Sequence, residues 1–179
     1  TFSLVLPAYN EETHIKKNIE AFFKTNVFDE IIVVDNNSTD NTKNEIQKTS
    51  AKYFKETTQG YGAALRKGME ESTCDYIVLC EPDSTFNSND IFKFLSYIDD
   101  FECIFGTRTT KSLIQKGAKM QFYLRVGNIV VAKILEYLYF GPTLSDVGCT
   151  YKMISRSSYE KIKNNLRVAG SEFQPELMI

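Results

Sequence analysis

Two acidic residues, Glu81 and Asp83, stand one residue apart directly after the apolar run at residues 76–80. Two carboxylates at this spacing can share one hard divalent cation, and Mg²⁺ or Mn²⁺ held by few protein oxygens keeps coordination positions free for phosphate. The alternative is a pair of turn acids in water. Because the pair follows a strand-like run, we expect Glu81 and Asp83 to bind Mg²⁺ or Mn²⁺.

A third acid, Asp35, ends the apolar, β-branched run at residues 30–35. A carboxylate there can accept hydrogen bonds from the N–H group of a nucleobase or from ribose hydroxyls. The alternative is an Asx turn or a partner for a helix dipole. We interpret Asp35 as a ligand contact and assign the Ser-Thr-Asp run at residues 38–40 to helix capping.

Gly60 and Gly62 flank Tyr61 just before a helix-like stretch. Small residues let the backbone approach a ligand, and a helix N-terminus favours phosphate. The run is neither G-x-G-x-x-G nor a Walker loop. It fits a tight loop into a packed helix equally well, so Gly60 and Gly62 are candidate nucleotide contacts with that alternative left open.

Three cations, Arg108, Arg125 and Lys152, are candidate phosphate partners, although surface bases are usually only hydrated. Arg125 belongs to a mostly apolar stretch at residues 120–140. A charge near the centre of a bilayer costs roughly 2.5–3.5 kcal/mol, so the three charged residues of this stretch argue against a membrane span. We expect a core helix or a helix lying in a membrane interface.

The elements that must position these side chains alternate along the chain. Apolar runs bounded by turn residues predict strands, and apolar residues at helical spacing predict helices between them. This alternation predicts a three-layer α/β/α fold with a mostly parallel central sheet. Ligands of such sheets bind at the carboxyl ends of the strands, where the candidate residues fall. We expect strands at residues 2–6, 30–35, 52–55, 76–80 and 102–106, and helices at residues 11–24, 38–47, 62–71 and 88–98.

Composition limits the classes of protein that this chain can represent. The chain has 179 residues, which is one domain by length, and we expect a single catalytic domain over residues 1–179 that is cut short at its C-terminal end. With 23 acids against 21 bases, the net charge of −2 gives no reason to expect a nucleic-acid partner. Four unclustered cysteines and one histidine make a structural zinc site unlikely and suit a reducing, cytoplasmic compartment.

Taken together, the motifs resemble the family-two inverting glycosyltransferases of GT-A fold. Within that family, the resemblance is closest to the branch of dolichol-phosphate mannose synthase and the polyprenyl-phosphate glycosyltransferases. The stretches that carry it are Leu-Val-Leu-Pro-Ala-Tyr-Asn-Glu at 4–11, Ile-Val-Val-Asp-Asn-Asn-Ser-Thr-Asp-Asn-Thr at 32–42, Gly-Tyr-Gly-Ala-Ala at 60–64, Glu-Pro-Asp at 81–83, Asp-Val-Gly-Cys-Thr-Tyr-Lys at 146–152 and Phe-Gln-Pro-Glu-Leu at 173–177.

The resemblance implies a role for each matching position. The family's nucleotide-binding positions are Pro7, Tyr9, Glu11 and Asp35, its metal and diphosphate positions are Glu81 and Asp83, and its phosphate-facing cations are Arg108, Arg125 and Lys152. The sequence departs from the usual family pattern, which has Asp at position 81, Asp-Gly or Asp-Asp at 36–37 and often Arg at 152. A Glu reaches farther than an Asp, and a Lys lacks the two-pronged grip of an Arg.

The resemblance implies transfer of a hexose from UDP- or GDP-sugar to a polyprenyl phosphate at the cytosolic face of a membrane, with peripheral membrane contact. A lipid phosphate is already anionic and needs cations rather than a base. A hydroxyl acceptor would need a carboxylate base, for which Glu176 or Glu172 is suited. The alternatives are a saccharide or small-alcohol acceptor, or a non-catalytic subunit that binds a nucleotide sugar.

Overall fold

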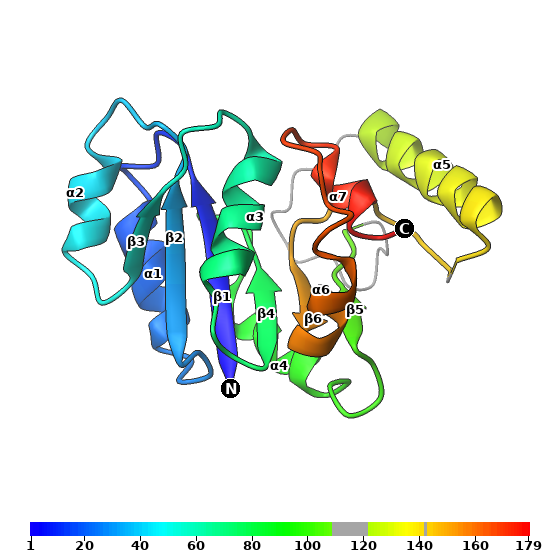
Figure 1. The fold of residues 1–179 in the computed structure, drawn as a ribbon, viewed down its shortest axis with the longest axis horizontal. Coiled ribbons are helices and arrows are strands. Elements are labelled where there is room, and N and C mark those ends of the chain that lie inside the picture. Colours follow the sequence, from blue (N-terminus) through cyan, green and yellow to red (C-terminus); the bar gives the residue numbers. More distant parts are fainter. Residues whose placement is uncertain (109–121, 142) are drawn as a thin grey trace.

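The computed structural model describes residues 1–108, 122–141 and 143–179. Within these residues, six strands form one sheet in the order β3-β2-β1-β4-β6-β5 (Figure 1). Strands β3, β2, β1 and β4 are parallel neighbours, while β6 runs antiparallel to both β4 and β5. The strands are β1 (Phe2–Ala8), β2 (Glu30–Asp35), β3 (Lys52–Lys55), β4 (Tyr76–Leu79), β5 (Cys103–Phe105) and β6 (Lys152–Ser155).

Helices cover both faces of the sheet, which confirms the predicted three layers. Alternate residues of a strand point to opposite faces, so Leu4 and Leu6 of β1 join one apolar cluster and Val5 joins the other. The first cluster is closed by α1 (Ile15–Phe23), α2 (Thr42–Gln47) and α4 (Ile91–Leu95), with the short η1 (Ser88–Asp90) preceding α4. The second is closed by α3 (Tyr61–Glu71), α6 (Arg156–Ile162) and α7 (Phe173–Glu176).

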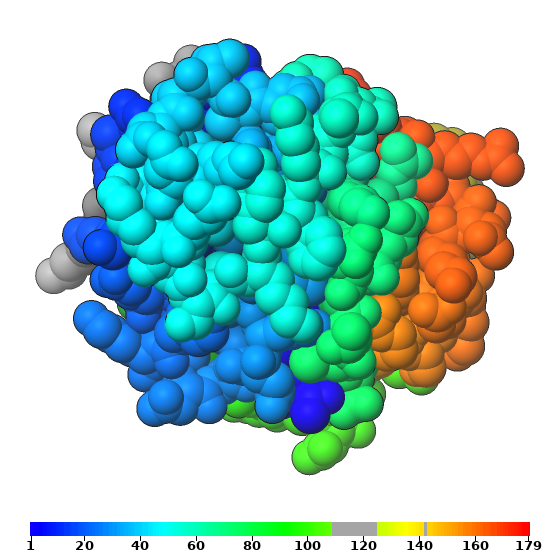
Figure 2. All heavy atoms as spheres, turned by 60° about the vertical axis from the view of Figure 1, so that its left-hand side comes forward, coloured from blue at the N-terminus to red at the C-terminus, as the bar shows by residue number. Residues whose placement is uncertain are grey.

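The two ends of the chain contribute to one continuous body. Seen from the β3 side, the segment up to about residue 80 and the orange C-terminal segment lie against each other on one surface (Figure 2). The contact is apolar, since Leu65 of α3 and Tyr159 of α6 belong to the same buried cluster. Residues distant in the sequence are therefore free to meet at the upper edge of the sheet.

The predicted strands are confirmed, but β6 is an addition that the sequence reading missed. Its run Lys-Met-Ile-Ser is only four residues long and begins with a charged residue, so it lacks the long apolar signature of β2. Inserted antiparallel between β4 and β5, it still leaves β5 running in the direction of β4. Three helices are shorter than predicted: α1 begins at Ile15, after a turn, and α4 ends at Leu95. The third, α2, begins only at Thr42 with Asn41 at its N-cap position, so the run at residues 38–40 precedes the cap instead of providing it.

The helix α5 (Phe122–Tyr139) stands apart from the sheet (Figure 1). It falls within the predicted stretch at residues 120–140, of which residues 120 and 121 lie outside the described residues. Its Ala132 and Leu135 pack against Leu144 and Val147 in a small cluster. Most of its other described apolar side chains are exposed. The prediction of a core helix therefore fits only the narrow strip of α5 that packs in this cluster. No helix among the described residues is long and apolar enough to cross a membrane.

Candidate active site

The candidate residues meet at one edge of the sheet because of strand direction. Ala8 at the end of β1 is paired with Asp35 at the end of β2. Strand β4 ends two residues before Glu81. Since β6 is antiparallel, it begins at this same edge, where Lys152 is paired with Leu79 of β4.

Glu81 and Asp83 form an acidic centre together with Glu11. Burial raises the pKa of Glu81, and the negative charge of Asp83 raises it further. The pKa of Glu11 is raised by burial and then by Asp83. Carboxylates that oppose each other's ionisation are stabilised by a cation. Among the described residues, no three Asp, Glu, His or Cys side chains are arranged to hold a metal by themselves. Two carboxylates that are completed by phosphate oxygens of a ligand are a set of donors that suits a divalent ion.

The turn after β4 fixes the second of these acids. The Oδ1 atom of Asp83 accepts hydrogen bonds from the backbone N–H of Thr85 at 3.0 Å and from its hydroxyl at 2.6 Å. Ser84 between them adopts a positive φ of 63°, a conformation that is uncommon for a residue with a side chain. The Asp83 carboxylate is thus oriented by its own turn, independently of any ligand.

A cavity of about 200 Å³ lies beside this centre, at the ends of β1 and β2. Two of the predicted nucleotide contacts, Pro7 and Tyr9, line it, whereas Glu11 and Asp35 do not. The full lining is Pro7, Ala8, Tyr9, Asn36, Gln59, Tyr61 and Ala64. Its apolar wall and aromatic side chains suit a planar base.

Asn36 shapes the rim of the cavity and was not among the predicted site residues. Its Nδ2 donates to the backbone oxygens of Glu56 at 3.1 Å and Thr58 at 2.8 Å, and its Oδ1 accepts from the N–H of Gly60 at 2.7 Å. The carboxamide has donors and an acceptor, so it can hold the loop 56–60 from both sides. This explains why Asn serves where the family often has an acid.

Asp35 is buried, with 4% of its surface exposed. Its Oδ1 accepts a hydrogen bond from the Ser38 N–H at 2.9 Å, and its Oδ2 accepts one from the Tyr53 hydroxyl at 2.9 Å. These bonds match the Asx-turn alternative. The role of Asp35 as a nucleotide contact stays a prediction.

Gly60 and Gly62 lie where chains pack closely, which matches the packed-loop alternative, and their role as nucleotide contacts stays a prediction. A Cβ atom at Gly60 would lie 2.2 Å from the carbonyl oxygen of Ala169, and one at Gly62 would lie 2.5 Å from that of Val168. Gly60 also has a φ of 145°. The Ala169 carbonyl accepts the N–H of Ala63 at 3.1 Å, so protein backbone already occupies this part of the α3 N-terminus.

Arg108 reaches the acidic centre from the end of β5. Its positive charge lowers the pKa of Glu81. It is held by Asp146, whose side chain is fully buried and accepts from Arg108 N at 2.9 Å, Nε at 3.1 Å and Nη2 at 3.3 Å. This two-pronged geometry fixes the plane of the guanidinium group. The motif at residues 146–152 did not predict that Asp146 pairs with Arg108.

Lys152 is only 1% exposed, so it is not the hydrated surface base of the alternative interpretation. Burial lowers its pKa to about 7. Its Nζ atom donates to the backbone oxygen of Gln174 at 3.2 Å and to the Oε1 atom of the same residue, and it lies 5.7 Å from the centre of the Phe105 ring. The nearby Asp146 carboxylate forms its ion pair with Arg108.

The match to a known family decides the identity of this fold. Residues 3–163 match the sequence profile of Glycosyl transferase family 2. The chain belongs to this family. The resemblance and the fold class predicted from the sequence are therefore confirmed.

Curated members of glycosyl transferase family 2 resemble the chain over nearly all of its length. It is 27% identical to the low-salt glycan biosynthesis hexosyltransferase Agl6 of Haloferax volcanii, with 100% of the chain and 44% of the relative covered. It is 25% identical to the dolichyl-phosphate beta-glucosyltransferase of Saccharomyces cerevisiae, with 99% and 61% covered. The chain thus spans about half the length of the curated relatives it matches.

Solved structures share the fold at lower identity. Glucosyl-3-phosphoglycerate synthase from Mycobacterium tuberculosis, in complex with Mn²⁺, UDP-glucose and glycerol 3-phosphate, matches with a TM-score of 0.71 and 18% identity, covering 97% of this chain and 62% of that one. Its complex with Mn²⁺ and UDP-glucose matches with a TM-score of 0.68 and 22% identity, covering 88% and 56%.

Two further predicted residues, Glu176 and Arg125, belong to α7 and α5. The Glu176 carboxylate accepts the backbone N–H groups of Arg167 at 2.8 Å and of Val168 at 3.1 Å and 3.2 Å. It therefore holds the loop that packs on Gly62, and it would have to give up these bonds to accept a proton. Arg125 lies in the first turn of α5.

Proposed function

We propose that the chain is the catalytic domain of a metal-dependent inverting hexosyltransferase. It transfers a hexose from a UDP- or GDP-sugar to a polyprenyl phosphate at the cytosolic face of a membrane. The observation that carries this proposal is the acidic pair Glu81 and Asp83, which faces Arg108 beside the cavity lined by Pro7 and Tyr9. The names of the relatives in archaea and yeast support a hexose as the transferred group and a dolichyl phosphate as the acceptor.

The residues of the cavity and the acidic centre divide the work on the donor. Pro7 and Tyr9 bind the base and ribose. Glu81 and Asp83 would hold a divalent cation, which would supply positive charge against the leaving diphosphate. The matched complexes that contain Mn²⁺ support its use. Arg108, held rigid by its pairing, adds a fixed positive charge where negative charge develops, which lowers the barrier.

The acceptor side requires cations rather than a base. A polyprenyl phosphate attacks as an anion from the face opposite the diphosphate, so the anomeric carbon is inverted and no proton has to be removed. Arg125 and Lys152 supply positive charge for this second phosphate. Glu176 is already bonded to two backbone N–H groups, which favours this acceptor over a hydroxyl that needs a general base.

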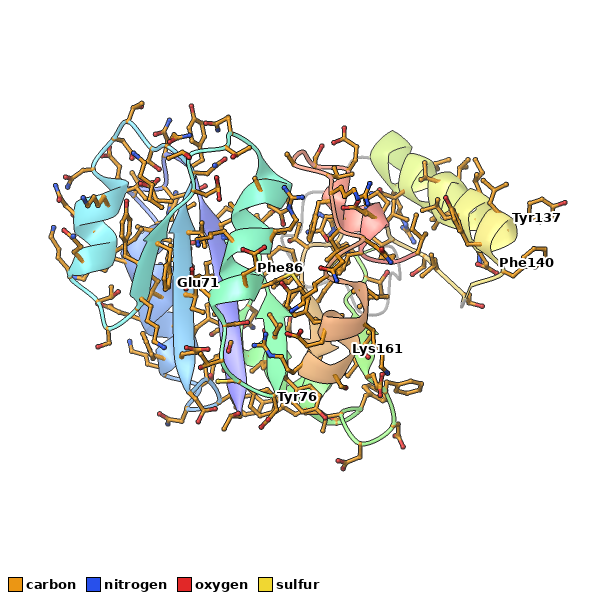
Figure 3. The ribbon with its side chains drawn as sticks, in the orientation of Figure 1. Glu71, Tyr76, Phe86, Tyr137, Phe140 and Lys161 are labelled. Carbon is orange, nitrogen blue, oxygen red and sulfur yellow. The ribbon has the colours of Figure 1, made fainter. Side chains whose placement is uncertain are left out.

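The exposed face of α5 supports contact with a membrane. Val130, Ile134 and Tyr137 share one side of the helix at spacings of four and three residues, and 50%, 50% and 79% of their surfaces are exposed. Phe140, just after the helix, is 94% exposed. Tyr137 and Phe140 project from the end of α5 away from the sheet (Figure 3). An apolar patch of this kind suits the boundary between headgroups and acyl chains.

The donor site is tested by calorimetric titration of UDP and of GDP, each with and without Mn²⁺. We expect one nucleotide to bind only with the metal, and binding to be lost in Glu81→Ala and in Asp83→Ala. Glu20→Ala, which removes an exposed acid on α1, is the matched control and keeps wild-type binding. Binding of neither nucleotide would refute the donor site.

The acceptor is tested by transfer assays on vesicles that contain a polyprenyl phosphate. We expect transfer to the lipid, and we expect Tyr137→Ser with Phe140→Ser to reduce both vesicle binding and transfer while leaving nucleotide binding unchanged. Transfer only to a saccharide or small alcohol in solution would select the alternative acceptor. Nucleotide binding without transfer to any acceptor would select the non-catalytic subunit.

A further inference from the structure

The side chain of Asn128 on α5 lies beside Arg108. A Cβ atom at Gly148 would lie 3.1 Å from Nη2 of Arg108 and 3.1 Å from Oδ1 of Asn128. The guanidinium group and the carboxamide therefore border the same small space, which a side chain at position 148 would fill. Asn128 is half-buried, and within the part of the chain that the structure describes its carboxamide forms no hydrogen bond. Such a group gains from a ligand that supplies the missing bond.

Packing of α5 on the rest of the protein holds Asn128 at this place. Asn128, Ala132 and Leu135 follow one another at spacings of four and three residues, so they share one side of α5. Ala132 and Leu135 pack in one cluster with Val147, and Gly148 is the next residue of the chain. The position of Asn128 is therefore set before any ligand binds.

Both side chains have hydrogen-bond donors that the protein does not use. Asp146 accepts from N, Nε and Nη2 of Arg108, whereas Nη1 donates to none of the described residues. The Asn128 carboxamide turns its oxygen toward Gly148, with Oδ1 at 3.1 Å and Nδ2 at 3.6 Å from the Cβ position. Its NH₂ group is thus left for a ligand. A ligand that accepts from a guanidinium group and a carboxamide at once needs several acceptor oxygens and a negative charge, and a phosphate has both.

Of the two substrates that carry phosphate, the acceptor fits the position of Asn128. Glu81 and Asp83, proposed for the donor diphosphate, follow β4. Asn128 instead belongs to α5, three residues after Arg125, which is proposed for the acceptor phosphate, and this spacing places both on the same side of the helix. The exposed apolar patch lies on the other side. A helix in a membrane interface buries its apolar side by about 5–10 Å, which leaves its polar side among the phosphate groups.

We propose that Asn128 binds the phosphate of the acceptor. Its NH₂ group donates to a phosphate oxygen beside Arg108. This bond orients the oxygen that attacks the anomeric carbon as the bond from that carbon to the diphosphate breaks. Because the carboxamide is uncharged, it contributes direction, and the neighbouring cations contribute the charge. This inference rests on the proposed function, since it takes a polyprenyl phosphate as the acceptor.

The direct test removes the carboxamide without weakening α5. Asn128→Ala deletes both donors and the acceptor, and Asn128→Leu does the same while keeping the size of the side chain. Ala and Leu are better helix formers than Asn, so a loss of activity cannot come from a less stable helix. Asn164→Ala, which truncates an exposed asparagine just after α6, is the matched control.

The measurement is the initial rate of hexose transfer to vesicles in which the fraction of polyprenyl phosphate varies at constant total lipid. We expect Asn128→Ala and Asn128→Leu each to raise KM for the lipid phosphate by about tenfold, the size of one hydrogen bond to a charged group. A contact made equally in the ground state and the transition state changes KM and leaves kcat nearly as it is. Asn164→Ala should behave as the wild type does.

A second acceptor separates the phosphate contact from contact with the membrane. A short-chain prenyl phosphate dissolved in water should show the same tenfold rise of KM in Asn128→Ala. Calorimetric titration of the nucleotide with Mn²⁺ should give wild-type affinity in this variant, because the donor does not touch Asn128.

Several results would overturn the inference. Wild-type KM in Asn128→Ala would show that Asn128 does not touch the acceptor, and a rise on vesicles alone would show that it acts through the membrane. Weaker nucleotide binding would place its contact on the donor. Circular dichroism checks folding, and should Asn128→Leu fail to fold, Asn128→Ala decides alone. Transfer to the lipid phosphate that is unchanged in Asn128→Ala leaves the proposed function intact, whereas a wild-type protein that transfers to neither phosphate overturns both.

Discussion

The edge of the sheet that carries the candidate site has two halves, and these hold their charged groups in different ways. On the side of β1 and β4, Glu11, Glu81 and Asp83 follow their strands, and burial together with the negative charge of Asp83 raises the pKa values of Glu11 and Glu81. On the side of β5 and β6, Arg108 is fixed by the fully buried Asp146, and Lys152 is fixed by the buried Gln174. The first half is an acidic centre that a cation would complete, whereas the second holds the Arg108 guanidinium and the Lys152 amine in place before any ligand arrives. Such preorganisation is the arrangement expected where charge develops in a reaction.

The largest effect should come from removing the support of Arg108. Asp146→Asn keeps the size of the side chain but loses its charge and one acceptor, so the guanidinium group is no longer fixed. We expect kcat/KM for the nucleotide sugar to fall roughly a hundredfold, or about 2.7 kcal/mol. Arg108→Ala should cause a similar loss.

The double variant decides how Asp146 acts. If it acts only through Arg108, then Asp146→Asn has no further effect on kcat/KM in the Arg108→Ala background. Losses that multiply in the double variant would contradict this and would show that Asp146 has an effect on kcat/KM that is independent of Arg108.

Gly62 and Gly127 lie in a tightly packed part and in an open part of the same chain. A Cβ at Gly62 would lie 2.5 Å from Val168 O and 2.7 Å from the Cβ of Phe173, while a Cβ at Gly127 of α5 would meet nothing within 4 Å. We expect Gly62→Ala to lower the free energy of unfolding by about 1–3 kcal/mol. Gly127→Ala should raise it by roughly 0.5–1 kcal/mol, since Gly is a poor helix former. Urea denaturation measures both, and equal effects would refute the packing role of Gly62.

The buried lysine predicts a pH dependence of stability. The pKa of Lys152 is about 7 in the folded protein against the ordinary 10.5. Between these values the unfolded chain binds more protons than the folded one, so stability rises with pH across this window. We expect this group to add up to about 1.4 kcal/mol per pH unit.

Lys152→Met isolates that contribution, because all other titrating groups are shared with the wild type. The difference between the two unfolding free energies, measured by denaturation from pH 7 to pH 10, should change with the slope of the lysine alone. Parallel curves would show that Lys152 keeps its ordinary pKa, as an exposed base would.

The smallest effect is expected on the exposed side of α5. Val130 and Ile134 are half exposed, so Val130→Ser and Ile134→Ser should each change the free energy of unfolding by no more than about 0.5 kcal/mol. Thermal denaturation checks this. A loss of several kcal/mol would instead mean that this face is covered in the folded protein.

The sequence predicts a strand correctly where a continuous apolar run marks it. The run at β2 is continuous and β-branched, so its position and its end at Asp35 were predicted correctly. Strand β6 was missed because its four residues begin with Lys152 and have no such run. A lysine is normally exposed, and only the neighbouring strands and α7 make this one buried.

In the candidate site, too, the sequence identifies residues whose signal is local and leaves open those whose partners are distant in the sequence. The acids after β4 were identified because a strand end and two carboxylates are visible in three consecutive letters. For Gly60 and Gly62 the sequence left open whether they contact a nucleotide or form a tight packed loop, because the residues that pack on them, Val168 and Ala169, lie about a hundred positions away. The sequence shows that a close approach occurs but not what approaches.

What the sequence by itself determined is the family, the alternation of strands and helices, and the acids that follow the parallel strands, since these depend on contacts within a few residues. Only the tertiary structure decided which side chains lie beside them. Arg108 and Asp146 are 38 positions apart, and Lys152 and Gln174 are 22 apart. The physical reason is that a hydrogen bond depends on distance and direction in space, and the antiparallel insertion of β6 together with the packing of α7 on α3 sets both.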